Sequence, residues 1–568
     1  MRPPHPVGPD DPSGQIVPGK AVEILSESQK KSTFFGGAAI LAVSSILVKV
    51  IGAIYRIPLG RILPDDVMGD YNAAYNIYNL FLTISTAGLP VALSKSISEA
   101  NALGRKNQVE RTFRVALTTF LTLGLISFFC MTVLAAPLAQ HAISNPKAVN
   151  CIIALAPSVL CVCIMSAFRG YFQGHFNMVP TGVSQIIEAG SKLLVGLALA
   201  VFFMKQFGEF YGSVGAIIGV SFGSVVALLF IIVLYFRQRT LSRRERSGDQ
   251  PEAPGTIFAN LMRLAIPITL GSAATSIVTL IDTKLVNSQL TTVFQKVDGL
   301  LLNPDGTGPA LDAARSLYGI YSKTMSIYNL PFSMMVPLTA CIIPAVSAAL
   351  TRRDRREAQL VSESALRIGL LVALPMGMGL FALGGPIMGF LFPAIDVDIA
   401  GPLLSVLGLA SIFVALQLLC NSILQANNMV NLPIVAVVIG GIVKIIVNYI
   451  LVGNPDIRIN GAPVGTLCCF IVVDLLEILI IRRAIPKPPS VLRAAAKPLL
   501  ASLVMAGAAW ASYGLLHRFL GNSLSTVGAI GVGVLIYVIL ILALRTITKE
   551  DLALMPKGDK IGRILHIG

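Results

Sequence analysis

The sequence predicts an all-α polytopic membrane protein with about 14 transmembrane helices. Of its 568 residues, 54% are hydrophobic and only 13% are charged, and the mean hydropathy is +0.76. Soluble domains carry about 25% charged residues. Apolar runs of about 18 residues or more recur along the chain, and each can cross a bilayer about 30 Å thick as a helix. None alternates apolar and polar residues as strands of a membrane barrel do.

The predicted spans follow one another with short connections. In order, they lie near residues 34–57, 71–93, 112–137, 149–170, 178–204, 212–236, 258–285, 317–350, 363–390, 400–425, 432–452, 461–481, 495–517 and 523–545. The eighth is longer than a bilayer requires and contains three prolines, so we expect a kink or break in it. The longest outer loop is expected at 286–316, where the sequence NPDGTG predicts a turn.

Basic residues indicate the orientation of these spans. They cluster in alternate connections, as in 237–246, 352–356 and 482–497, and also in the two ends of the chain. Because cytoplasmic loops are enriched in Lys and Arg, both termini are predicted to be cytoplasmic. Residues 1–32 are expected to be a disordered tail and 547–568 a second cytoplasmic tail. Topology explains the net charge of +15, so no nucleic-acid partner is expected.

An internal repeat divides the chain. Gln173 and Lys192 recur with the same spacing as Gln425 and Lys444, and the tetrapeptide Ile-Tyr-Asn-Leu occurs at both 77–80 and 327–330. We therefore expect two six-helix lobes in parallel orientation: an N-lobe at 33–256 and a C-lobe at 257–485. Spans 13 and 14, at 486–546, lie outside the repeat. Transporters with such halves place their site at the interface between them.

Six basic residues lie inside predicted spans and away from their cytoplasmic ends, where a charge costs about 2.5–3.5 kcal/mol on insertion scales. Arg114, Arg169, Arg263 and Arg367 lie near cytoplasmic ends and are expected to be anchors at the interface. Lys49 and Arg56 are seven residues apart, on one face of the first span. With Lys284 and Lys323 they are expected to line a cavity between the lobes and to bind an anionic group such as pyrophosphate. For Arg56 and Lys284, an anchoring role at the membrane interface is the alternative.

The other two intramembrane lysines have candidate acidic partners. Glu188 and Lys192 are spaced to form an ion pair within one helix. Lys444 has no local acid, and Asp474 and Glu477 in span 12 are its expected partners.

Other polar groups in the spans are candidates for coupling or sugar binding. Asp282 lies on a different helix face from Lys284, so it is expected to be freer to bind a cation or proton. Tyr71, Tyr75 and Tyr78 share one face, which suits a sugar or an interfacial belt.

Enzyme signatures are absent from the sequence. It contains no phosphate-binding loop of the GxxxxGK[ST] type and no His/Cys metal spacing. We therefore expect neither an enzyme nor a cofactor, and energy would come from an ion gradient of Na⁺ or H⁺, from the membrane potential or from consumption of the transported substrate. A glycan polymerase would need an acid/base constellation, and loop 286–316 contains aspartates but no His. A scaffolding protein would not need buried cations.

Three stretches resemble a known family: KVIGAIYRIPLGRILP at 49–64, GLPVALSKSISEA at 88–100 and FRGYFQGHFNMVP at 168–180. They are similar to the polysaccharide-biosynthesis branch of the multidrug/oligosaccharidyl-lipid/polysaccharide (MOP) flippase superfamily, particularly the stage V sporulation protein B group and MurJ-type lipid II flippases. The resemblance implies a two-lobe, fourteen-helix transporter of the bacterial plasma membrane. Such a protein exports an undecaprenyl-pyrophosphate-linked precursor for peptidoglycan synthesis by alternating access, with lipid II the first candidate.

The resemblance also implies roles for particular residues. Cations from helices 1, 2 and 8 line the cavity in MurJ-type members; Lys49, Arg56 and Lys323 match approximately, whereas 71–93 contains no cation. Some relatives bind sodium through helices 7, 11 and 12. The matching set here is Asp282, Lys444, Asn448 and Thr466, in which the lysine ammonium could replace the ion.

The resemblance further implies a lipid-tail groove at spans 13 and 14, a monomer, and a lipid-linked oligosaccharide and membrane lipids as partners. The alternatives are an exporter of another lipid-linked polysaccharide or a spore-cortex precursor, and a multidrug/cation antiporter. An antiporter should prefer acids to cations in its cavity.

Overall fold

The computed structural model describes residues 43–242, 248–304, 306–427, 429 and 431–546. The predicted tails at 1–32 and 547–568 lie outside these residues. Within the described part, the chain is helical with no β-strand. The prediction of an all-α membrane protein is therefore confirmed.

Thirteen of the described helices are long and apolar enough to cross a membrane, and they match the predicted spans except the eighth. The N-terminal half contains the first helix (Val43–Ile62), α2 (Asp65–Thr86), α3 (Leu89–Ala102), α4 (Lys106–Val133), α5 (Ala135–Pro137), α6 (Val149–Gly174), α7 (Val179–Phe207) and α8 (Tyr211–Ser242). The remainder contains α9 (Pro254–Lys296), α10 (Pro309–Thr351), α11 (Arg355–Ala382), α12 (Gly384–Leu391), α13 (Val397–Ala426), α14 (Asn431–Val452), α15 (Gly461–Ala484), α16 (Val491–Leu516) and α17 (Asn522–Ala543).

Helix α10 corresponds to the eighth predicted span. It runs for 43 residues without interruption, so the predicted break does not occur, while the predicted kink stays a prediction. The predicted outer loop at 286–316 is also shorter than expected. Helix α9 continues to Lys296 and α10 begins at Pro309. The predicted turn forms in the remaining segment, where the Asn303 amide donates to the Thr307 carbonyl at 2.7 Å.

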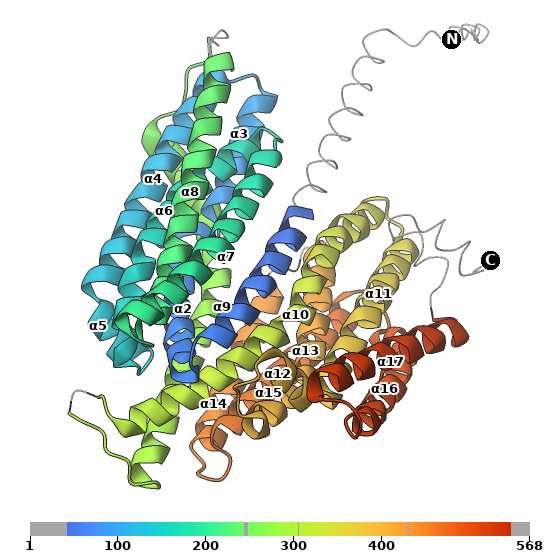
Figure 1. Cartoon of the computed structure of the whole chain (residues 1–568). Helices are drawn as coiled ribbons and strands as arrows, with labels where there is room; N and C mark the ends of the chain where they lie inside the picture. The colour runs from blue at the N-terminus through green and yellow to red at the C-terminus, as the bar shows by residue number, and fades with distance from the viewer. Residues whose placement is uncertain (1–42, 243–247, 305, 428, 430, 547–568) are drawn as a thin grey trace, which may run out of the picture.

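The helices form two groups that diverge toward the end where the first helix begins (Figure 1). The first helix with α2–α8 is called the N-lobe below, and the second half of α9 with α10–α15 the C-lobe. The first half of α9 packs against α3 and α4 of the N-lobe. In the N-lobe, α6 packs against α4 and α8, and α7 packs against α8. In the C-lobe, α13 packs against α10, α11 and α15, and α14 packs against α15. Helices α16 and α17 pack against each other and α16 against α11, at the side of the C-lobe (Figure 1).

The lobes meet through α2 and α10 on the side predicted to be outer. A Cβ atom added at Gly319 would lie only 1.6 Å from the backbone oxygen of Asp65, and one at Gly69 would lie 2.7 Å from that of Arg315. Only glycine permits so close an approach of two helix backbones. The pair of glycines therefore allows the backbones of α2 and α10 to approach closely at this end.

Candidate functional site

A cavity of about 460 Å³ lies between the lobes. It is lined by the first helix and by α2, α7 and α10, so both lobes contribute. Its lining residues are Val48, Lys49, Gly52, Ala53, Arg56, Ile57, Tyr75, Lys192, Ser326, Ile327, Asn329, Leu330, Phe332 and Ser333. The cavity contains three cations and no acidic side chain among these residues, so it suits an anionic ligand.

Arg56 lies near the C-terminal end of the first helix and contacts residues of both lobes. Its guanidinium donates to the Ser326 hydroxyl of α10 at 3.1 Å and, more weakly, to the Asn72 carbonyl oxygen of α2 at 3.4 Å. The structure therefore places Arg56 among the residues that line the cavity. Lys49 lies two turns away on the same face, and its side chain is exposed.

Lys192 is the third cation of the cavity, contributed by α7. Its ammonium lies 4.8 Å from the ring centroids of both Tyr55 and Tyr75 and donates to the Tyr75 hydroxyl at 3.2 Å. The predicted pair between Glu188 and Lys192 is wrong. Glu188 instead binds Arg169 of α6 at 3.0 Å, because that guanidinium reaches it from the neighbouring helix.

The predicted tyrosine face of α2 is continuous. The rings of Tyr71 and Tyr75 are stacked with centroids 5.6 Å apart, and those of Tyr75 and Tyr78 lie 5.1 Å apart. Tyr71 and Tyr78 are buried in the protein core, which excludes an interfacial belt for them. Tyr75 alone of the three lines the cavity.

The structure places the other two predicted cavity cations elsewhere. Lys323 is buried, binds the Asp65 carboxylate at 2.6 Å and donates to the Leu63 carbonyl at 3.1 Å. The nearby carboxylate at the start of α2 draws it to the contact between the lobes. Lys284 is exposed on α9 and is not among the lining residues, because Asp282 occupies the inward face of that helix.

A network of ions joins the lobes at the predicted outer end. Arg315 of α10 is 2% exposed, and its guanidinium binds both oxygens of the fully buried Asp70 of α2. It also binds Asp312 at 2.7 Å, and Asp312 binds Lys147 of the N-lobe. Two-point Arg–carboxylate pairs are directional and strong. This network therefore closes the lobes at the end away from the cavity's exposed lysine.

Asp312 is the partly exposed member of this network. Partial burial would raise the pKa of its carboxyl, but hydrogen bonds and charges from Lys147 and Arg315 outweigh burial and hold that pKa below its ordinary value. The carboxylate therefore stays ionised down to lower pH in the closed arrangement.

The sequence reasoning missed this network. It assigned Arg315 to an outer loop, although three aspartates at 65, 66 and 70 directly precede the predicted second span. The sequence does contain a signal for this contact. An acidic cluster precedes the second span, and Arg315 lies at the matching position before the eighth span of the repeat. Only the tertiary structure shows that the two ends touch.

A second polar cluster forms inside the C-lobe. The Lys444 ammonium of α14 binds the Asp282 carboxylate of α9 at 2.7 Å, and the Asn448 amide donates to the same carboxylate. Thr466 is buried on α15, the helix that packs against α14. Asp474 and Glu477 were the wrong partners for Lys444, because Asp282 reaches it first from α9.

This cluster does not fit a sodium ion. A cation would have to share Asp282 with an ammonium already at ion-pair distance, and like charges so close repel. The Asn448 oxygen is directed at Gly465, where an added Cβ would lie 1.8 Å away. Asp282, Lys444 and Asn448 are therefore a packed, ion-paired contact between α9 and α14, and no transport step is assigned to a bound metal here.

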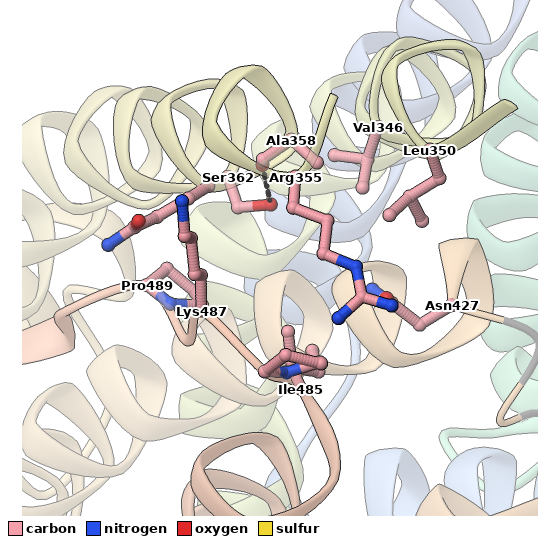
Figure 2. Close-up of a pocket in the computed structure, with 11 residues that line it drawn as sticks. Val346, Leu350, Arg355, Ala358, Ser362, Asn427, Ile485, Lys487 and Pro489 are labelled. Atoms are coloured by element: carbon pink, nitrogen blue, oxygen red, sulfur yellow. Dashed lines mark hydrogen bonds between the residues drawn. The ribbon is translucent and has the colours of Figure 1, made fainter. Parts of the chain in front are cut away.

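A second cavity, of about 140 Å³, lies in the C-lobe and shares no lining residue with the cavity between the lobes. Figure 2 shows Arg355 extending between Asn427 and Ile485, with Lys487 on the opposite rim. All its lining residues come from α10, α11 and the segments that follow α13 and α15. Because the N-lobe contributes nothing, movement of one lobe against the other would not open or close this cavity.

Comparison with known proteins gives consistent matches. The polysaccharide biosynthesis protein family model matches residues 34–350, and the MatE model matches residues 319–450. Stage V sporulation protein B of Bacillus subtilis (strain 168) is 24% identical over 94% of this chain and 99% of its own length. Lipid II flippase MurJ of the same organism is 23% identical over 80% of this chain and 83% of its own length. A solved structure of lipid II flippase MurJ in an inward closed conformation superposes with a TM-score of 0.66, at 15% identity, covering 89% of this chain and 98% of that one.

Proposed function

Because the chain belongs to the polysaccharide biosynthesis protein family, within the MOP flippase superfamily, we propose that it is a flippase for a lipid-linked sugar. Its substrate would be an undecaprenyl-pyrophosphate-linked cell-wall precursor, with lipid II the first candidate. It would carry this precursor outward across the bacterial plasma membrane for peptidoglycan synthesis.

The observation that carries this proposal is the cationic cavity between the lobes. Lys49, Arg56 and Lys192 converge there from two helices, and none of the described lining residues is acidic. A pyrophosphate is negatively charged and would neutralise these cations, and arginine can bind it through two parallel hydrogen bonds. Tyr75 and Asn329 offer a ring and an amide for the attached sugar.

The contacts between the lobes support alternating access. The Arg315–Asp70 and Lys323–Asp65 pairs close the predicted outer end, while Lys49 is exposed at the other. A headgroup would enter beside Lys49 and move toward Arg56. Breaking the outer ion pairs would then open the cavity to the other side. The lipid chain would remain in the bilayer beside the lobes, where α16 and α17 are the proposed groove.

The test is a flipping assay in proteoliposomes with purified full-length protein. Lipid II, a second undecaprenyl-linked glycan and a cationic drug are compared as substrates. We expect flipping of a lipid-linked glycan, at least a tenfold loss (about 1.4 kcal/mol) in the K49A/R56A double variant, and no drug transport. A preference for the second glycan would exclude lipid II as the main substrate. Drug transport with no glycan flipping would contradict the proposal and support an antiporter, as the MatE match allows.

A further inference from the structure

Two carboxylic acids are buried in the middle of α15, without hydrogen-bond partners in the part of the chain that the structure describes. Asp474 is 2% exposed and Glu477 is 0% exposed. They are three residues apart, on one face of the helix, and Asp474 lies about 20 Å along the helix from Gly461. All four carboxyl oxygens lack a hydrogen-bond partner among the described residues. The central cavity does not include either residue.

The surroundings of these acids are mostly apolar. Cys420 and Ile423 of α13 and Ile481 of α15 belong to one buried apolar cluster. The polar neighbour on α13 is Gln417, which is 8% exposed and faces Glu477. Neither acid forms an ion pair with a described Lys, Arg or His.

The remaining titratable groups near the acids supply no compensating charge. Cys420 faces them from α13, and Cys469 lies one turn away on α15. On α14, the cation Lys444 is held by Asp282 at 2.7 Å. The cation that sequence spacing offered to these acids is therefore already neutralised elsewhere.

An unpaired carboxylate in an apolar interior is costly, and two side by side repel each other. Either a metal ion or protons must therefore compensate the charge. The described residues contain no group of three or more His, Cys, Asp and Glu side chains that could hold a metal, and two carboxyls with one amide fall short of the six or so oxygens that hard cations take. Protons are the ligand that this geometry accommodates.

We propose that Asp474 and Glu477 form a proton-binding centre in the C-lobe, separate from the substrate cavity, whose protonation couples transport to the proton gradient. The proposal rests on the proposed flippase function. Helix α13 packs against both α15 and α10, and α10 supplies Ser326 and Asn329 to the cavity. Loss of a proton would place a charge at the α13–α15 contact and strain its packing. That strain would reach the cavity through α10.

The binding of protons is tested first, by infrared spectroscopy of the purified full-length protein in lipid nanodiscs. Near neutral pH we expect the carbonyl stretch of buried, protonated carboxylic acids in the wild type. The D474N/E477Q double variant replaces both acids by amides, which have the shape of protonated carboxylic acids but no carboxyl group. It should therefore lose that signal. As a matched control, D298N removes an acid from the partly exposed Asp298–Arg458 pair and should retain it. An unchanged signal in the double variant would overturn the proposal.

Coupling is tested in proteoliposomes that flip lipid II with and without an imposed pH gradient. Across one pH unit the ratio of protonated to ionised carboxyl changes about tenfold. The wild type and D298N should therefore respond to the gradient, whereas D474N/E477Q should flip at a rate that the gradient does not alter. A gradient response that survives in a double variant of unchanged thermal stability would refute coupling at this centre. Failure of the wild type to flip any glycan would instead refute the proposed function, while the infrared result still decides whether the acids hold protons.

Discussion

At the scale of single residues, Lys192 shows how one cation is held ready for an anion. Its ammonium lies over two tyrosine rings, 4.8 Å from each centroid, and has no carboxylate partner among the described residues. Rings attract the cation without neutralising it, and a desolvated contact of this kind contributes about 2 kcal/mol. Arg56 is held similarly by neutral partners, Ser326 and Asn72. Both therefore keep their full charge available to a ligand.

We therefore predict that K192M lowers the rate of glycan flipping at least tenfold, since it removes about 1.4 kcal/mol or more of binding to the anionic headgroup. K192R should retain part of the rate, because it keeps the charge but fits the space between the rings less well. The measurement is the proteoliposome assay. K205M, on the same helix but exposed near its end, serves as the control. Equal rates for K192M and K205M would contradict the role of Lys192.

Asp312 gives a prediction about pH. Lys147 and Arg315 lower the pKa of this carboxyl in the folded protein. The stability it contributes is therefore present above the unfolded-state pKa and is lost as pH falls through the folded-state pKa. At neutral pH we expect D312N to lower the free energy of unfolding by less than about 1 kcal/mol, because the pair is partly exposed, and so to lower the unfolding temperature slightly. The difference in unfolding temperature between wild type and D312N should shrink in acid. A difference that stays constant with pH would contradict this role of Asp312.

At the scale of elements, the crossing of α2 and α10 depends on the absence of side chains. A Cβ at Gly319 would lie 1.6 Å from the backbone oxygen of Asp65, far inside van der Waals contact. Because that oxygen belongs to backbone, no flexible side chain can move aside. The crossing therefore sets how tightly the lobes close at the predicted outer end.

We predict that G319A separates α2 from α10 and widens the predicted outer end. Distance measurements between spin labels on the N-lobe and C-lobe at that end should show a longer or broader distribution than in the wild type. G507A is the matched control, since a Cβ there meets nothing within 4 Å. Identical distributions for G319A and wild type would show that this crossing does not limit closure.

At the scale of the whole molecule, the outer ion pairs bias the lobes toward one state. Arg315 and Asp70 are both buried, and removing one partner of such a pair costs about 3–5 kcal/mol because the other charge is left alone. Moving a two-state equilibrium from 1:99 to 99:1 requires about 5.5 kcal/mol. One substitution therefore supplies a large share of the free energy needed to change the state.

We predict that R315M shifts the population toward the state open at the predicted outer end, where the unpaired Asp70 regains water. The double variant D70N/R315M removes both charges of the fully buried Arg315–Asp70 pair and should return most of the way to the wild type. Single-molecule distance measurements between the lobes would record both populations. D298N breaks an ion pair within the C-lobe and should shift neither. A double variant as open as R315M would mean that the uncompensated Asp70 does not drive the shift.

The long apolar helices were the part of the fold that the sequence could predict. The spans were predictable because burial in lipid demands long apolar runs, and no other residues can replace them. The continuity of the proline-containing helix α10 and the extension of α9 to Lys296 could not be predicted from the sequence. Both depend on neighbouring helices that support a segment whose own composition argues against a continuous helix.

The sequence by itself determined that this is an all-α membrane protein, and that Lys49 and Arg56 share one face of its first helix. Periodicity and the cost of charge in a bilayer are properties of single segments. Only the tertiary structure decided which charges meet. It paired Lys444 with Asp282, Glu188 with Arg169 and Lys323 with Asp65, and left Lys192 beside two tyrosines. The physical reason is that an ion pair forms wherever opposite charges lie within a few ångströms, and distances between helices are set by packing, which spacing along the chain does not encode.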